Sequence, residues 1–262
     1  MRNKPITILT PEEDKVARSM VIARDDAIIA FNKPPGLACQ TRSTADHTLD
    51  RLLWAFAKSN GKRPHLVHRL DRETSGVIVA AHTKPAAAAL HGAFEARCVQ
   101  KTYLALVQRP TNDCACDEGT ITQPLATVRD GTGTRTAAVE PGTEGAKPAK
   151  THWKCLGQSQ QAALLSIRPT TGRMHQIRVH LALADMPILG DRQYGLGAAD
   201  DTAWTDPIPR TMLHAFSLRF PHPSGTQSTV KADPPQDFRD VAQAMELANS
   251  LERVLVDAAE AR

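Results

Sequence analysis

The stretch "HLVHRLDRETSGVIVAAHT", from His65 to Thr83, places a dense polar segment directly before an apolar run. Its middle, "HRLDRETSG", sets Asp71 between Arg69 and Arg72. The run "VIVAA" that follows is short, apolar and partly β-branched, which predicts a buried strand. An aspartate at such a point can be a turn residue, as most loop aspartates are. It can also be a functional carboxylate, because neighbouring guanidinium groups keep it ionised and ready to act as a nucleophile or base.

The composition is that of an ordinary globular protein. Hydrophobic residues make up 41% of the 262 residues and charged residues 23%, which is close to the usual balance. No stretch approaches the roughly 18 apolar residues that a membrane helix needs, and the N-terminus lacks the pattern of a secretory signal. Five cysteines in a chain of this length do not suggest a disulfide framework. We therefore expect a cytoplasmic protein with no membrane partner.

The charge is spread unevenly along the chain. The net charge is +4, and residues 234–262 hold six acidic and three basic residues, which leaves +7 on the rest. A basic body is compatible with a polyanionic partner such as RNA. It is equally compatible with a plain solvated surface, so the charge alone does not decide the function.

Apolar periodicity predicts strands and helices that are interspersed without a regular βαβ rhythm, which favours an α+β fold. We expect strands at 27–32, 65–68, 77–82, 101–108, 151–156, 161–169, 213–220 and 228–232. We expect helices at 48–61, capped by Thr48, at 83–98, capped by Thr83, from Thr170 or Thr171 to 185, and at 235–258. The segment 129–150 is rich in Gly, Thr, Pro and Lys and predicts an exposed, mobile insertion.

A second polar cluster, "TTGRMHQIRVHLA", covers residues 170–182. On a helix, Met174, Ile177 and Leu181 would share the face that packs on the core. Arg178 adjoins that face and could reach inward as a partly buried cation that needs an anion. The alternative is a solvated basic helix face.

Two other stretches are structural by default. Tyr103 in "KTYLALV" lies on an expected strand, where a tyrosine is usually core or rim packing. The stretch "ILGDRQYG" at 188–195 is expected to be a structural loop.

The motif "HRLDRETSG" resembles the H-R-L-D-x-x-T-S-G motif of the RluA family of RNA pseudouridine synthases and matches it at every fixed position. Further stretches resemble landmarks of that family and occur in the family's order. They are "DDAIIAFNKPPGL" at 25–37, "KTYLALV" at 101–107, "AKTHW" at 149–153, "GRMHQIRVHLA" at 172–182, "PILGDRQYG" at 187–195 and "LHAFSLRFPHP" at 213–223. Six ordered matches make coincidence very unlikely, and the resemblance covers about residues 22–223.

The resemblance implies a role for several residues. In that family the aspartate of the motif is catalytic, which corresponds to Asp71, and the arginine that enters the RNA stack corresponds to Arg69. Tyr103 corresponds to the tyrosine that lies against the uracil and is a candidate base for the C5 proton. Arg178 corresponds to the arginine that pairs with the catalytic carboxylate. Further RNA contacts are expected from His68, Arg72, Arg173 and His175.

The resemblance also implies an architecture. We expect one pseudouridine synthase domain over 1–262, with its core at about 22–223 and a C-terminal helix at 235–258. Its central sheet should be mixed or mostly antiparallel, flanked by helices and loops, with the catalytic cleft across the sheet. The isomerisation conserves all atoms, so we expect no cofactor and no metal. We expect a monomer whose partner is RNA.

The sequence gives less information about which RNA is the substrate. Only about 20 residues precede "ARDDAIIAF", so we expect no N-terminal S4-type RNA-binding module. We expect 23S ribosomal RNA as the substrate, with transfer RNA as the next choice.

Two other functions can be considered. A metal-dependent phosphoesterase acting on RNA could use His65, His68 and Asp71 with His175 and His180, but a strand at 65–68 would point the first two to opposite faces. A non-catalytic RNA-binding module would leave the full set of catalytic matches unexplained.

Overall fold

The computed structural model describes residues 8–41, 47–109, 117–130, 133–195 and 208–260. They belong to two compact units. The first unit draws on Met1–Gln100 and Ala215–Asp233, and the second on Lys101–His214 and Pro234–Arg262. Both units combine strands with helices, so the predicted α+β class is confirmed. In the ranges described, none of the helices has the length and apolar character needed to cross a membrane.

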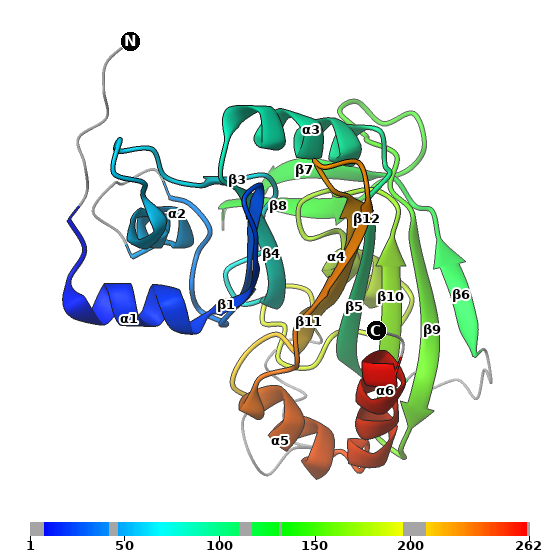
Figure 1. Ribbon diagram of the computed structural model, residues 1–262. Helices are drawn as coiled ribbons and strands as arrows, with labels where there is room; N and C mark the ends of the chain where they lie inside the picture. Colours follow the sequence, from blue (N-terminus) through cyan, green and yellow to red (C-terminus); the bar gives the residue numbers. More distant parts are fainter. Residues whose placement is uncertain (1–7, 42–46, 110–116, 131–132, 196–207, 261–262) are drawn as a thin grey trace. The chain divides into compact units, whose positions relative to one another are not determined.

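The first unit is built on a sheet whose middle strand carries the apolar run after Asp71 (Figure 1). In order across this sheet lie β1 (Val21–Arg24), β2 (Ile28–Lys33), β4 (Ser75–Ala81) and β11 (Leu213–Pro221), while β12 (Gln227–Lys231) pairs with β11 and β3 (His65–Leu66) with β4. β1 with β2, β2 with β4 and β11 with β12 are antiparallel. Every residue of β4 is buried, as the apolar pattern predicts. This buried strand is the rigid support of the "HRLD" loop.

Two helices of the first unit begin where the sequence predicts. Thr83 caps α3 (Lys84–Glu95) by accepting a hydrogen bond from the Ala86 N–H. Thr48 likewise caps α2 (Leu49–Leu52), which continues as the 3₁₀ helix η1 (Leu53–Phe56). The predicted helix over 48–61 is therefore too long. Its last residues, "AKSNG", include Ser, Asn and Gly, which favour turns over helix.

Helix α1 (Pro11–Ser19) was not predicted from the sequence. Its signal is a capping box, in which Thr10 and Glu13 each accept a hydrogen bond from the other's backbone N–H. Glu13 is buried and forms an ion pair with Arg51 of α2 at 2.8 Å. The hydrogen bond from Arg51 lowers the pKa of Glu13 from 4.5 to about 2. α1 is therefore fixed against α2 by charge as well as by its cap.

The second unit contains a four-stranded antiparallel ladder and a separate hairpin. The ladder runs β5 (Gln100–Gln108), β10 (Ala162–Pro169), β9 (Thr151–Gln158), β6 (Glu118–Ile121), and the hairpin pairs β7 (Leu125–Asp130) with β8 (Gly133–Ala138). The segment 129–150, predicted as an exposed, mobile insertion, includes β8 and is therefore not a loop throughout. Thr136 and Ala149 are buried in it, because Thr-rich sequence suits a strand and small residues pack closely.

Helices of the second unit differ from the prediction at their ends. The cap of α4 (Gln176–Leu183) is His175, four or five residues after the expected cap at Thr171 or Thr170, and His175 adopts a left-handed conformation with φ of 53°. Met174 consequently lies outside the helix and is 48% exposed, whereas Ile177 and Leu181 are buried as predicted.

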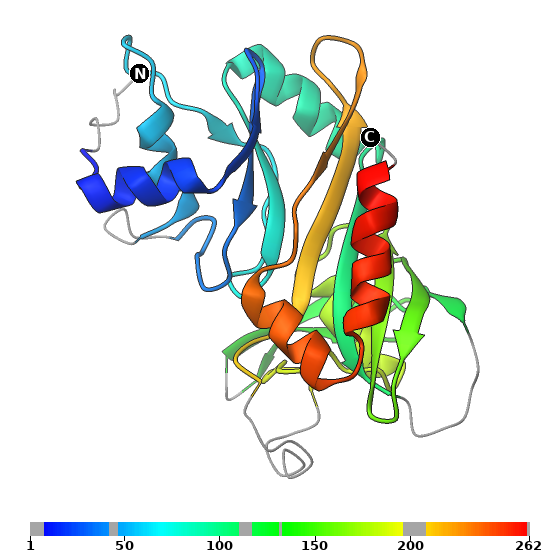
Figure 2. The ribbon, with the colours of Figure 1, turned by 60° about the horizontal axis from the view of Figure 1, so that its bottom comes forward.

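The predicted C-terminal helix over 235–258 is two helices, α5 (Gln236–Ala244) and α6 (Ala248–Glu260). Glu246, with φ of 59°, separates them. Figure 2 shows α6 alongside the strands of its own unit. The Ser250 side chain occupies the space that a side chain at Gly157 of β9 would need.

Candidate active site

Asp71 lies in a tight turn at the entrance to β4. Its backbone carbonyl accepts a hydrogen bond from the Thr74 N–H at 3.2 Å. Thr74 and Ser75 are buried, while Asp71 itself is partly exposed. The motif thus buries its hydroxyl residues at the end of the strand and keeps the carboxylate at the surface of the first unit.

A buried lysine anchors this loop on one side. Lys33, at the end of β2, is fully buried and its ammonium donates to three backbone carbonyls. These belong to Pro34 at 2.9 Å, Leu37 at 2.8 Å and Arg72 at 3.0 Å. A buried charge is tolerated only with such partners, because its desolvation is costly. Lys33 therefore ties the Pro-Pro-Gly turn to the residue that follows Asp71.

Two further contacts hold the loop on its other sides. The Cys39 sulfur accepts from the Leu70 N–H and donates to the Leu70 carbonyl, both at 3.3 Å. Burial raises the pKa of the Cys39 thiol, which keeps the proton needed for that second bond. Gly76 has φ of 113°, and a side chain there would overlap the Ala215 carbonyl. Glycine is therefore required at this position.

The predicted RNA-binding residues of this loop differ in exposure. Arg69 is exposed, and so is Arg72, whose Nε donates to the Gly36 carbonyl at 3.0 Å. His68 instead accepts the Val79 N–H through Nε2 at 3.0 Å, and its ring lies 4.9 Å from that of Phe94. These contacts give His68 a structural role, and an RNA contact by it stays a prediction.

The histidines of this region do not form a metal cluster. Across the ranges that the structure describes, no three His, Cys, Asp or Glu side chains are grouped so that they could hold a metal ion. The Nε2 atom of His68 is already bound to backbone, as described. The phosphoesterase alternative therefore has no donor set in these ranges.

In the second unit Arg178 is held by an aspartate. Its Nε lies 2.6 Å from Asp191 Oδ2 and its Nη2 lies 2.8 Å from Asp191 Oδ1, a bidentate pair. The Asp191 side chain is 1% exposed and that of Arg178 11%. Burial raises the pKa of Asp191, but the guanidinium and the N–H groups of Gln193 and Tyr194 outweigh it and hold this pKa below its ordinary value.

This pair was not foreseen from the sequence. The stretch at 188–195 was interpreted as a structural loop, and the anion expected for Arg178 was Asp71. A buried arginine next to a "GD" loop is the signal that could have indicated Asp191. The pairing of Arg178 with Asp71 joins residues of different units and stays a prediction.

An aromatic ring completes the surroundings of Arg178. The guanidinium carbon lies 4.9 Å from the centre of the Tyr194 ring, within the range of a cation–π contact. The Tyr194 hydroxyl is hydrogen-bonded to His175 Nδ1 at 2.9 Å and accepts the Thr136 N–H at 3.2 Å. His175 and Arg178 thus contact the same tyrosine, and an RNA contact by His175 stays a prediction.

The last two predicted residues, Tyr103 and Arg173, lie on the same unit, which also holds the partly buried cation Lys101. Tyr103 is half-buried on β5, opposite Ile167 of β10. Arg173 is half-buried, and its Nε donates to the Pro148 carbonyl at 3.2 Å. The Lys101 ammonium donates to the Thr171 carbonyl at 3.1 Å, and burial lowers its pKa. A phosphate contact by either cation would compete with these bonds.

Comparison with known proteins places the chain in a family. The family described as RNA pseudouridylate synthase matches residues 27–183. The ribosomal large subunit pseudouridine synthase C of Yersinia pestis is 34% identical over 247 residues, which cover 90% of this chain and 74% of that protein. The ribosomal large subunit pseudouridine synthase D of Vibrio vulnificus is 33% identical over 263 residues, 94% of this chain and 78% of that protein.

A solved structure agrees with this assignment. Human RNA Pseudouridylate Synthase Domain Containing 4 aligns with a TM-score of 0.72 at 25% identity, over 90% of this chain and 97% of that one. The sequence match, the structural match and the ordered motifs lead to one conclusion. The chain belongs to the RluA family of RNA pseudouridine synthases.

Proposed function

We propose that this enzyme converts specific uridines of large-subunit ribosomal RNA to pseudouridine, with Asp71 as the catalytic carboxylate. One observation carries the residue assignment. Asp71 stands at the surface end of a fully buried strand, in a loop anchored through Lys33 and Cys39. Such support is what a catalytic side chain needs in order to keep its position. The ribosomal substrate is supported by the names of the relatives, which act on the large subunit.

The reaction breaks the C1′–N1 bond of a uridine and joins C1′ to C5 of the same uracil. All atoms are conserved, so the protein must supply only a nucleophile or base, a place for the detached ring and an acceptor for one proton. Asp71 can attack C1′, attack C6 or remove a sugar proton, and each of these routes requires the ionised carboxylate.

Tyr103 and Arg178 take the accompanying roles in this proposal. Tyr103 offers a ring face for the uracil and a hydroxyl that can accept the C5 proton. Arg178, already held by Asp191 and Tyr194, would present its charge to Asp71 without losing orientation. Arg69 is exposed and can fill the space that the uridine leaves in the RNA stack, a step that costs a few kcal/mol.

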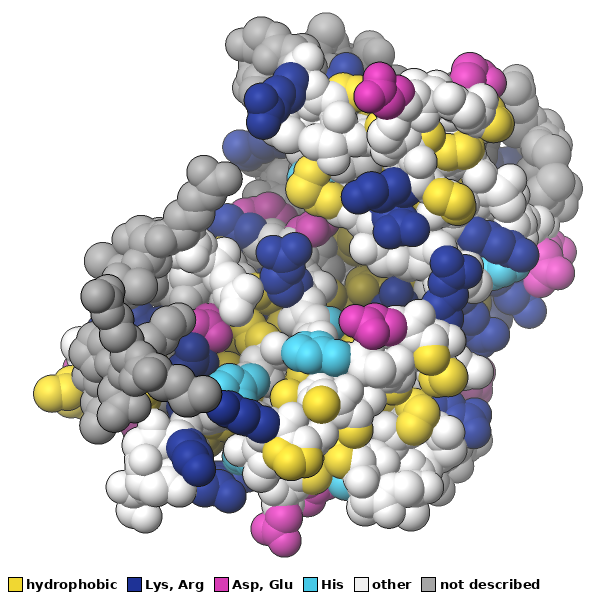
Figure 3. All heavy atoms as spheres, turned by 90° about the horizontal axis from the view of Figure 1, so that it is seen from above, with side chains coloured by type: hydrophobic (Ala, Val, Ile, Leu, Met, Phe, Trp, Pro, Cys, Tyr) yellow, Lys and Arg dark blue, Asp and Glu magenta, His cyan; other side chains and the backbone are white. Residues whose placement is uncertain are grey.

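The surface charge suits such a partner. On the face seen in Figure 3, Lys and Arg side chains are spread among polar and hydrophobic ones, with Asp and Glu between them. This distribution can serve phosphate contacts at several points, although it marks no single binding surface. The enzyme would act as a monomer in the cytoplasm, where ribosomal RNA is assembled.

The test replaces the carboxylate and maps the product. Asp71→Asn and Asp71→Ala should abolish pseudouridine formation in unmodified large-subunit ribosomal RNA and leave the affinity for that RNA largely intact. Glu73→Gln, two residues away and exposed, is the matched control and should keep its activity. Full turnover by either Asp71 variant would refute the assignment. Pseudouridine mapping of total RNA from cells with and without the gene would identify the nucleotide.

A further inference from the structure

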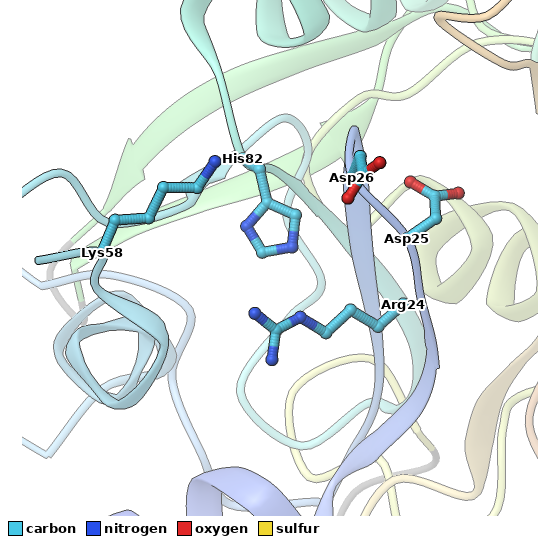
Figure 4. A pocket seen from close by; sticks show the side chains of 5 residues that line it. All are labelled: Arg24, Asp25, Asp26, Lys58 and His82. Carbon is cyan, nitrogen blue, oxygen red and sulfur yellow. The ribbon is translucent and has the colours of Figure 1, made fainter.

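The first unit contains a cavity that the catalytic assignment does not use. It has a volume of about 300 Å³ and is lined by Arg24, Asp25, Asp26, Lys58 and His82. Arg24 ends β1, Lys58 follows η1, and His82 follows β4. In Figure 4 the ends of Arg24 and Lys58 reach toward the His82 ring from two sides, whereas Asp25 points away from it.

His82 is a buried polar group without a partner. The residue is 7% exposed, and its Nε2 atom makes no hydrogen bond. A buried nitrogen left in this way is energetically unfavourable, so its retention in the cavity wall calls for an explanation. A ligand that bonds to Nε2 would remove this cost.

The charged groups around His82 favour an anionic ligand. Asp25 is already engaged, because its carboxylate accepts the N–H groups of Ala27 at 2.7 Å and Ile28 at 2.8 Å and lies 3.0 Å from His222 Nε2. The Arg24 guanidinium lies 5.8 Å from the Phe56 ring centre, which holds it without neutralising it. Arg24 and Lys58 therefore bring two cations to a cavity that is also lined by the His82 ring and by the carboxylate of Asp26.

Burial lowers the pKa of His82, and the charges of Arg24 and Lys58 lower it further, against the opposite effect of Asp25 and Asp26. The imidazole is therefore neutral at neutral pH, with one N–H to donate. An anion between the two cations would oppose their effect and raise this pKa.

We propose that Arg24, Lys58 and His82 form a phosphate-binding subsite that takes a backbone phosphodiester of the RNA. The oxygens of a phosphodiester would accept from the guanidinium, the ammonium and the imidazole Nε2–H. This proposal rests on the proposed function for the identity of the partner. The subsite lies at the opposite end of β4 from Asp71, about 20 Å away for a strand of 7 residues. The phosphate would thus belong to a nucleotide other than the target uridine.

The first experiment uses the protein alone with inorganic phosphate as the probe. NMR signals of the His82 ring should shift saturably on titration and its pKa should rise, with sodium chloride of equal ionic strength as the control. Arg24→Gln and Lys58→Gln should each weaken or abolish this response. Both side chains are exposed, so these variants should fold. A His82 ring that does not respond to phosphate overturns the proposal.

The second experiment identifies the source of the phosphate. The affinity for an unmodified large-subunit ribosomal RNA transcript is measured against salt concentration. Arg24→Gln and Lys58→Gln should each reduce the slope of log K against log salt by about 0.7 to 0.9, the loss of one phosphate contact. Lys15→Gln, an exposed lysine on α1, is the matched control and should not change the slope. If the His82 ring responds to phosphate but neither variant changes the salt slope more than Lys15→Gln does, the natural ligand would be free phosphate or a nucleotide. That result would overturn the assignment to RNA.

Failure of this proposal can be told from failure of the proposed function. Asp71→Asn tests product formation and leaves the His82 cavity intact. If that variant still forms pseudouridine, the catalytic assignment fails while the phosphate titration stands. If His82 ignores phosphate while Asp71→Asn is inactive, only the subsite fails.

Discussion

The loop of Asp71 and the surroundings of Arg178 are held in different ways. Lys33 and Cys39 fix the Asp71 loop through its backbone, by bonds to the carbonyl of Arg72 and the peptide groups of Leu70. Arg178 is fixed through its side chain, by the carboxylate of Asp191 and the ring of Tyr194. Backbone anchoring leaves the side chains of a loop free to vary, whereas side-chain anchoring makes each partner indispensable.

This difference predicts where substitutions act. In the first unit the critical residues should be those beneath the loop, and neighbours such as Glu73 should matter little. In the second unit a change of one charged residue should affect its partner directly. The following predictions test this contrast, beginning with the largest expected effect.

Arg178→Met should lower the rate of pseudouridine formation by about 10² to 10³-fold, because the reaction would lose the cation that we propose as the partner of Asp71. Single-turnover kinetics at saturating RNA measures this loss. Arg253→Met, on the exposed side of α6, removes the same charge far from the site along the chain and should keep the wild-type rate. An unchanged rate in Arg178→Met would show that it does not act on the carboxylate.

Lys33→Met should lower the free energy of unfolding by about 3 kcal/mol, because three backbone carbonyls lose a charged donor in a buried place. Urea denaturation measures this change. Lys62→Met, an exposed lysine of the same unit, should change stability by less than about 0.5 kcal/mol. A Lys33 variant as stable as the Lys62 variant would contradict the anchoring role.

Asp191→Asn should lower the free energy of unfolding by about 2 kcal/mol, since Arg178 loses its counter-ion but stays 11% exposed to water. It should also reduce the rate, because the guanidinium loses its orientation. Asp191→Glu keeps the charge and should recover part of the lost stability and part of the lost rate. Equal effects of Asn and Glu would mean that shape rather than charge holds Arg178.

Acid should weaken the fold before the carboxylates titrate. Burial lowers the pKa of both His82 and His180 below 6.5, so the unfolded chain binds protons there at a higher pH than the folded chain does. The unfolding free energy should therefore fall as the pH drops below about 6.5 and level off below the folded pKa values. Urea titrations between about pH 7 and pH 5 measure this slope, and His82→Gln should reduce it. A flat profile would contradict the neutral state of these imidazoles.

Much of the fold follows from local signals in the sequence. The caps Thr48 and Thr83 and the apolar run of β4 were predicted, because each is a short pattern with a direct physical effect. The late start of α4 was missed, since His175 adopts a left-handed conformation and bonds to Tyr194, which lies 19 residues further along the chain. Hydrogen bonds between distant segments are not visible in a local pattern.

The residues of the candidate site also fall into those that were predicted from local patterns and those that were missed. Asp71 was found from its motif, which is a short local pattern. Asp191 was missed because its role depends on an arginine 13 positions before it. The anchoring by Lys33 was missed too, since a lysine in a sequence gives no sign that it will be buried.

Because Lys33 is buried, the rate of its chemical modification can report on the opening of the loop. An amine with no access to solvent cannot be acylated, so reagents that modify the exposed lysines should spare Lys33 while the protein is folded. Lys33 would then be modified only when the turn opens. The rate of acylation would therefore report how often the loop that carries Asp71 opens. Bound RNA that tightens the loop would slow that reaction at a residue it never touches.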